Sequence, residues 1–293
     1  MLILIFAALE LPDLVRAGSV CSSWHRAYTS LHDLGLYKQQ QTPCLLYTAK
    51  SSGASAAGLY SLTEKKPCTL SLPNPPIRTR YLISSAYGWI ITVNDRSELH
   101  LVNPIMGDQI ALPSITTIEY VTPVYDENGV VEYYWTCMSS TFGLSKLRDY
   151  FVMVVLSSDP STGSYIAVLI HQLRCQLSFA RGGDDCWTCL PPHEFYADCV
   201  FKDGLLYALT KLGKIHEFDF SGPAVKQKVF LEKMEGCILG NMYIVQAPSG
   251  DLLQIWGEDE VSQRELDPSE EDHYFQRSLI RTIPLHSKCI EWT

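Results

Sequence analysis

From residue 44 onward, the hydrophobic pattern of the chain is that of many short strands. Apolar and β-branched runs alternate with Gly, Pro, Asn and Asp, which favour turns. Residues 82–113 show this most clearly, because turn signals at Asn94-Asp95 and Met106-Gly107-Asp108 separate successive runs. Short turns between consecutive strands give an antiparallel meander. The sequence therefore predicts four strands here, at residues 82–85, 88–93, 98–104 and 109–113.

The same order of runs and turns recurs along the chain. Residues 195–220 repeat it, and residues 242–256 begin a further copy. Tyr150–Leu156 and Tyr165–Leu173 predict a hairpin, and two earlier strands are expected at Cys44–Thr48 and Leu59–Leu62, joined by a loop at 49–58. Meanders that repeat every ~40–50 residues are typical of a β-propeller. We therefore predict a mainly β fold, with a propeller of about five or six blades over residues 44–293.

Residues 1–38 have a helical pattern instead. Pro12 suits the first turn of a helix, Gly18 can end that helix in the left-handed conformation, and Ser19 can cap the next one. Residues 39–43 are the expected hinge to the β region. After Ser19, apolar residues recur at helical spacing and predict one stripe that needs a partner surface: Val20, Cys21, Trp24, Tyr28 and Leu31.

This N-terminal module resembles the F-box, the three-helix domain that binds Skp-type adaptors of cullin ubiquitin ligases. The similarity lies in Ile5-Phe6, Leu9, Pro12-Asp13-Leu14 and the Val20-Cys21-x-x-Trp24 element. An F-box usually opens with Leu-Pro and an acidic residue before the Ile-Phe pair, whereas this sequence begins at Met1. By motif position, the resemblance implies adaptor-binding roles for Ile5, Phe6, Leu9, Pro12, Leu14, Val20, Cys21 and Trp24.

The β region resembles the KIB-type propeller of a large plant F-box family. Members of that family usually continue past the equivalent of Trp292, so we expect either a shortened relative or a ring that closes differently. The segments that carry the resemblance are Pro75-Pro76-Ile77-Arg78, Gly88-Trp89 and residues 96–104, 109–113, 203–209 and 250–256.

The net charge of −9 narrows the possible partners. Residues 258–272 carry most of it and predict a solvated insertion between strands, so the rest of the chain is close to neutral. No basic footprint or polybasic segment is present, which predicts neither a nucleic-acid nor a membrane partner. The acids of this segment are Glu258, Asp259, Glu260, Glu265, Asp267, Glu270, Glu271 and Asp272.

The apolar run Leu2–Leu9 is interpreted as an amphipathic helix. No basic residue precedes it, acidic residues and a proline follow at once, and it is far shorter than the ~20 residues that span a bilayer. The ten cysteines are then expected to be reduced and mostly buried, in a cytoplasmic and/or nuclear protein.

Candidate chemistry is sparse. Cys186 and Cys189, with His193 and Cys199, come near a zinc-knuckle pattern, but the internal spacing differs and Cys199 falls within a predicted strand. We interpret these as loop and core thiols. No nucleophile elbow, dinucleotide-binding loop or P-loop occurs, and residues 182–185 predict a solvent loop. The histidines are scattered and the tryptophans Trp89, Trp135, Trp187, Trp256 and Trp292 are expected in blade cores, so we predict no catalytic residue, metal site or cofactor.

The resemblance implies a non-catalytic substrate-recognition subunit of an SCF-type ubiquitin ligase. Its partners would be a Skp-type adaptor, through it a cullin, and a target protein bound by the propeller. Two alternatives stay open: a propeller that works without the adaptor, as a binding module or an enzyme, and a non-functional remnant.

Overall fold

The computed structural model describes residues 2–9, 11–18, 20–33, 44–48, 56–62, 65–136, 140–173, 176–233, 241–258 and 277–283. The chain forms two compact units. The first unit comprises residues 1–148, 158–165 and 182–187, and the second comprises residues 149–157, 166–181 and 188–293. Each unit is therefore discontinuous in sequence. The predicted hinge at 39–43 and the acidic residues 259–272 lie outside the described residues.

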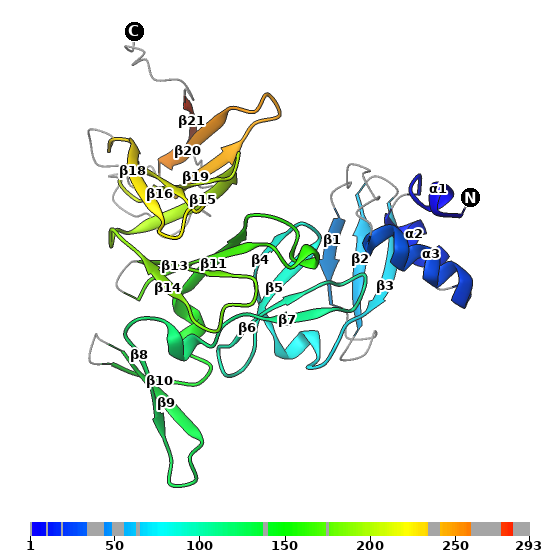
Figure 1. Cartoon of the computed structure of the whole chain (residues 1–293), viewed down its shortest axis with the longest axis horizontal. Helices are drawn as coiled ribbons and strands as arrows, with labels where there is room; N and C mark the ends of the chain where they lie inside the picture. The colour runs from blue at the N-terminus through cyan, green and yellow to red at the C-terminus, as the bar shows by residue number, and fades with distance from the viewer. Residues whose placement is uncertain are drawn as a thin grey trace, which may run out of the picture. The chain divides into compact units, whose positions relative to one another are not determined.

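Among its described residues, the first unit contains three α-helices and three antiparallel sheets (Figure 1). The helices are α1 (Leu2–Phe6), α2 (Leu11–Gly18) and α3 (Ser22–Asp33). The strands are β1 (Cys44–Tyr47), β2 (Ala56–Ser61) and β3 (Lys66–Ser71), then β4 (Tyr81–Ala86), β5 (Trp89–Val93), β6 (Leu99–Val102) and β7 (Gln109–Ala111), then β8 (Val121–Tyr125), β9 (Val131–Thr136) and β10 (Ser140–Gly143). No helix among the described residues is long and apolar enough to cross a membrane.

The second unit contains the other three sheets of the described chain. Their strands are β11 (Phe151–Leu156), β12 (Ile166–His171), β13 (Gln176–Arg181) and β14 (Thr188–Leu190), then β15 (Tyr196–Lys202), β16 (Leu205–Thr210), β17 (Ile215–Asp219) and β18 (Lys226–Leu231), then β19 (Met242–Gln246), β20 (Leu252–Glu258) and β21 (Arg277–Ile283). In every sheet, spatial neighbours are consecutive in sequence and antiparallel. The prediction of a mainly β, propeller-type fold is confirmed.

The predicted meander at 82–113 is confirmed as the sheet β4–β7, and the hairpin at 150–173 as β11 and β12. The prediction of a loop at 49–58 is wrong for its last three residues, because β2 already begins at Ala56. Gly58 pairs with Tyr47 of β1, and a Cβ on Gly58 would clash with the Tyr47 ring. The small residues that suggested a loop therefore make room for an aromatic ring on the neighbouring strand.

The tryptophans do not all lie in cores as predicted. Trp89 and Trp187 are buried, and their indole N–H groups donate to Asp159 Oδ1 (3.0 Å) and the Pro113 carbonyl (2.8 Å) within the first unit. Trp135 is 43% exposed, so the prediction is wrong there. Its strand alternates, and the face carrying Tyr134 is the buried one. The side chains of Trp256 and Trp292 lie outside the described residues.

In the second unit, a buried carboxylate joins two neighbouring sheets. Asp198 of β15 accepts from the backbone N–H of Cys199 (2.8 Å) and, on β19, from that of Ile244 (2.9 Å). Ile244 in turn belongs to the hydrophobic cluster that includes Leu209, Met242 and Leu252. Burial raises the pKa of Asp198, although the two N–H donors oppose that rise.

Replacing Asp198 by alanine is expected to destabilise the β15–β19 contact by about 1–3 kcal/mol, because the Ile244 N–H is left buried without an acceptor. Hydrogen exchange of the β19 amides measures this directly. Asp95→Ala, at an exposed turn of the first unit, is the control and should leave the exchange of β19 unchanged. Equal exchange in both variants would contradict the role given to Asp198.

Candidate functional site

The N-terminal helices form a small module whose close packing depends on Gly18. The predicted end of α2 at Gly18 is confirmed, but the left-handed conformation is wrong, since Gly18 is not among the glycines with positive φ. A Cβ there would lie 2.9 Å from the ring of Tyr28 on α3. Glycine is needed at this position because α2 and α3 approach closely.

Helix α3 begins later than its sequence suggests. Its first residue is Ser22, and the His25 N–H donates to the Cys21 carbonyl at 2.8 Å. Val20 and Cys21 therefore precede the helix, and the predicted stripe from Val20 to Leu31 is wrong in its first two members. The predicted cap, Ser19, lies outside the described residues.

The module has its own hydrophobic core. Phe6 from α1 packs edge-on against Trp24 of α3, with ring centroids 5.4 Å apart at 72°. Leu9 and Ala27 lie at the margin of this core. Its buried members come from all three helices: Phe6, Leu14, Ala17, Tyr28 and Leu31.

This core continues onto the β4–β7 sheet of the same unit. Ile105 and Met106, from the turn between β6 and β7, pack against the helical cluster. Burial, and then the nearby Asp108 carboxylate, raise the pKa of Tyr28. At a second point, the Arg16 guanidinium approaches the Pro67 carbonyl at 3.5 Å. The helices are therefore packed against the β part of the first unit.

The eight residues with predicted adaptor-binding roles occupy different environments. Phe6 and Leu14 are buried inside the module, and Leu9 and Trp24 are partly buried. Ile5 (50%), Val20 (64%) and Cys21 are exposed, whereas Pro12 lies in α2 and its side chain is outside the described residues. Leu4, which the motif did not single out, is 77% exposed beside Ile5.

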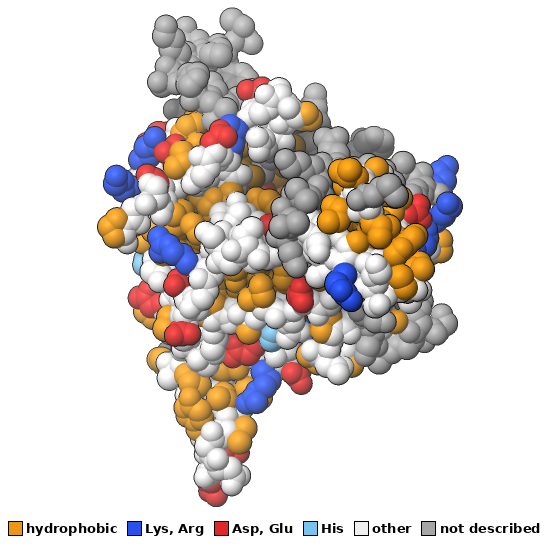
Figure 2. All heavy atoms as spheres, turned by 45° about the vertical axis from the view of Figure 1, so that its right-hand side comes forward, with side chains coloured by type: hydrophobic (Ala, Val, Ile, Leu, Met, Phe, Trp, Pro, Cys, Tyr) orange, Lys and Arg blue, Asp and Glu red, His pale blue; other side chains and the backbone are white. Residues whose placement is uncertain are grey.

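These exposed apolar side chains give the module a hydrophobic surface. Figure 2 brings forward the side of the molecule that carries the helices and shows hydrophobic side chains gathered at the surface there. We call Leu4, Ile5, Val20 and Cys21 the exposed apolar set. Leu4 and Ile5 lie on α1, whereas Val20 and Cys21 lie just before α3. Exposed apolar side chains of this kind often mark a contact surface for another protein.

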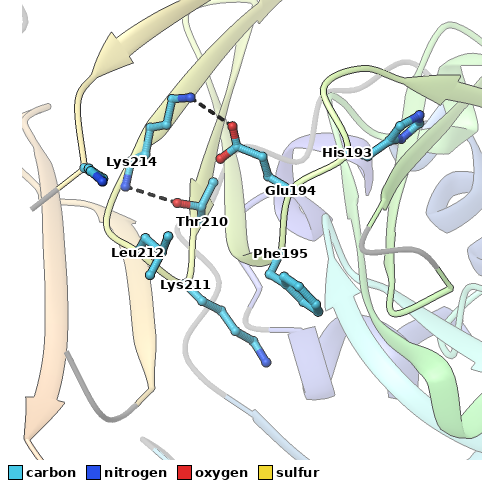
Figure 3. Close-up of a pocket in the computed structure, with 8 residues that line it drawn as sticks. His193, Glu194, Phe195, Thr210, Lys211, Leu212 and Lys214 are labelled. Atoms are coloured by element: carbon cyan, nitrogen blue, oxygen red, sulfur yellow. Dashed lines mark hydrogen bonds and ion pairs between the residues drawn. The ribbon is translucent and has the colours of Figure 1, made fainter. Parts of the chain in front are cut away.

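A second site lies at one end of the β15–β18 sheet. Successive strands of a meander run in opposite directions, so the segment entering β15, the β16–β17 turn and the end of β18 meet at the same end. They line an open surface cavity of about 490 Å³, which we call the β15–β18 cavity (Figure 3). Its lining residues are His193, Glu194, Phe195, Thr210, Lys211, Leu212, Lys214 and Lys233.

A charge cluster holds one wall of this cavity in place. Glu194 Oε1 lies 2.9 Å from Lys214 Nζ and 3.3 Å from His216 Nε2. Burial raises the pKa of Glu194, but the Lys214 hydrogen bond and the charges of His216 and Lys214 outweigh it, so the pKa is lowered. Burial lowers the pKa of His216, against the effect of Glu194. Glu194 is therefore an ionised, already paired group (Figure 3).

Of the six described cysteines, only Cys199 is buried, so the prediction that the cysteines are mostly buried is wrong for this part of the chain. Cys199 is 3% exposed within a hydrophobic cluster, which confirms its prediction as a core residue, and burial raises the pKa of its thiol. Cys189 Sγ lies 3.9 Å from His193 Nδ1, and Gln176 Nε2 lies 2.9 Å from the same nitrogen. Cys199 is not among the described side chains that lie close enough to Cys189 and His193 to share a metal ion.

Similarity to known proteins defines the class of protein to which this chain belongs. The profile described as the KIB1-4 beta-propeller matches residues 59–277. The fold is thus a β-propeller, of the kind that plant F-box proteins carry. The chain belongs to the KIB1-4 beta-propeller family.

Curated relatives from Arabidopsis thaliana agree with this assignment. The chain is 25% identical to F-box protein KIB4 over 228 residues, which cover 75% of this chain and 57% of that protein. It is 26% identical to F-box protein KIB3 over 230 residues, which cover 75% of this chain and 46% of the relative. The chain therefore spans about half the length of these curated relatives.

Proposed function

We propose that this protein is a non-catalytic substrate-recognition subunit of an SCF-type ubiquitin ligase. The observation that carries the proposal is the exposed apolar set on a packed three-helix module. Three of its four members, Ile5, Val20 and Cys21, stand at positions that resemble those of an F-box. Membership of a family whose curated relatives are named F-box proteins supports it. Such a subunit accelerates ubiquitin transfer by holding a target near the conjugating enzyme, which raises its effective concentration.

In this proposal, the exposed and the buried residues among the eight have different roles. Ile5, Val20 and Cys21, together with Leu4, contact the Skp-type adaptor directly. Phe6 and Leu14 act from inside the module, because they are too buried to touch a partner. The adaptor in turn binds a cullin, and the assembly acts in the cytoplasm and/or nucleus.

Replacing Ile5 and Val20 by aspartate tests adaptor binding. Each change puts a charge into an apolar interface but disturbs no buried side chain, since both residues are at least half exposed. We expect each to weaken adaptor binding by about 2 kcal/mol, or roughly thirtyfold in Kd. Co-purification of the full chain with a purified plant Skp-type adaptor, followed by titration, measures the loss.

The matched control is Leu62→Asp. Leu62 is 55% exposed, which is close to the 50% of Ile5. It follows β2 and therefore lies outside the helical module. It should bind adaptor like the wild type. A folded wild-type chain that never retains adaptor would overturn the proposal and leave a propeller that works as an independent binding module.

A further inference from the structure

The β15–β18 cavity has a charge opposite to that of the chain that carries it. Three lysines line it against a single carboxylate, Glu194, while the whole chain has a net charge of −9. Glu194 is already paired with Lys214. Within the described residues, neither Lys211 nor Lys233 makes an ion pair, and both are exposed. Two cations are therefore available to a ligand.

Apolar side chains stand beside these cations. Phe195 is 62% exposed and Leu212 is 64% exposed, and Figure 3 shows Lys211 extending between them. The two side chains offer apolar surface that a hydrophobic group of a ligand can bury. The cavity thus combines positive charge with an apolar rim.

The backbone gives this arrangement a fixed shape. The Lys211 N–H donates to the Phe195 carbonyl at 2.7 Å, which ties the β16–β17 turn to the segment entering β15. The Lys214 N–H donates to Thr210 Oγ1 at 3.1 Å and closes the turn. Phe195, Lys211 and Leu212 are consequently held together before any ligand arrives, which lowers the entropy cost of binding.

We propose that the β15–β18 cavity binds an extended acidic segment of the target protein; this inference rests on the proposed function. The Asp or Glu carboxylates of this segment would pair with Lys211 and Lys233, and a hydrophobic side chain between them would cover Phe195 and Leu212. No lining residue of the cavity is an arginine, so neither a carboxylate nor a phosphate finds a bidentate partner there. Lys211 and Lys233 act as separate point charges on two segments, an arrangement that suits carboxylates spread along a chain.

A labelled synthetic peptide tests this with the full chain. The probe is rich in glutamate with a central leucine, and its fluorescence anisotropy reports binding. Three further peptides replace glutamate by lysine, leucine by serine, or glutamate by phosphoserine. We expect the glutamate peptide to bind, the lysine peptide to fail, and added salt to weaken the complex because exposed charges are screened.

Charge reversal at the cavity identifies the site. The double variant Lys211→Glu/Lys233→Glu should weaken binding of the glutamate peptide by about tenfold or more. Lys226→Glu is the matched control, since Lys226 is an exposed lysine at the start of β18 and hence at the opposite end of the same sheet. It should bind the peptide like the wild type.

A separate variant tests the apolar contact. Phe195→Ala should weaken the leucine peptide but change the serine peptide little, because only the former makes the contact that is removed. Lack of wild-type binding, equal binding by the double variant, or binding of the phosphoserine peptide alone would each overturn the proposal. Adaptor retention is measured separately on the same variants, so failure of the cavity is distinguishable from failure of the adaptor surface.

Discussion

Replacing Phe6 by alanine is expected to destabilise the three-helix module by about 3–5 kcal/mol and to remove adaptor retention with it. Phe6 is 1% exposed and contacts Trp24, so truncation opens a cavity among all three helices. Its neighbour Ile5 is half exposed, and Ile5→Ala should weaken adaptor binding without loosening the helices. Alanine at either of these two adjacent residues is thus predicted to reduce adaptor binding, through loss of folding at Phe6 and through loss of contact at Ile5.

Hydrogen exchange separates the two cases. In Phe6→Ala, the amides of α2 and α3 should exchange faster in the absence of adaptor, whereas in Ile5→Ala they should exchange as in the wild type. Adaptor titration of both variants completes the comparison. Unchanged exchange in Phe6→Ala, or faster exchange in Ile5→Ala, would contradict the division between core and contact residues.

Acidification is expected to destabilise the second unit by about 3 kcal/mol between pH 6.5 and pH 4 through His171. His171 is 1% exposed, its Nε2 lies 3.0 Å from Ser178 Oγ, and burial lowers its pKa to about 4. The unfolded chain takes up a proton near the ordinary pKa of 6.5, but the native chain does not until about pH 4. Protonation in this window therefore favours the unfolded state.

Denaturant unfolding at several pH values measures this effect. The His171→Gln variant lacks the titrating group. Between pH 6.5 and pH 4, its free energy of unfolding should therefore fall by about 3 kcal/mol less than that of the wild type, whatever the stability of the variant at neutral pH. His216 adds to the wild-type slope with the same sign, while Asp198, whose pKa burial raises, acts oppositely. Because the variant keeps both groups, the difference between the two slopes isolates His171; equal slopes would refute the assignment.

The sheets could be predicted from sequence because their signals are local. The β4–β7 meander follows from alternating runs and from turns such as Asn94-Asp95, where the Asn94 side chain accepts two backbone N–H groups. The start of β2 could not be predicted from sequence, because Ala56-Ala57-Gly58 has weak strand propensity. This part of the strand depends on packing against the Tyr47 ring of the neighbouring strand. Long-range packing overrides local preference at that point.

The candidate sites depend on long-range contacts even more. The F-box resemblance places Ile5 and Phe6 in one motif, but only the packing of three helices shows that one is exposed and the other buried. Likewise, Lys211 and Leu212 are unremarkable turn residues in sequence. They become part of a cavity because the antiparallel order brings Phe195 and Lys233 to the same end of the sheet.

The discontinuous first unit has a consequence for synthesis on the ribosome. Trp89 finds its hydrogen-bond partner in Asp159, and Trp187 brings its own indole to Pro113. The first unit therefore stays incomplete until residue 187 has left the exit tunnel, by which time β11, β12 and β13 of the second unit have already emerged. The two units must mature together rather than in the N-terminal-first order common for separate domains. A nascent chain halted near residue 148 would leave the Trp89 indole N–H without its Asp159 acceptor.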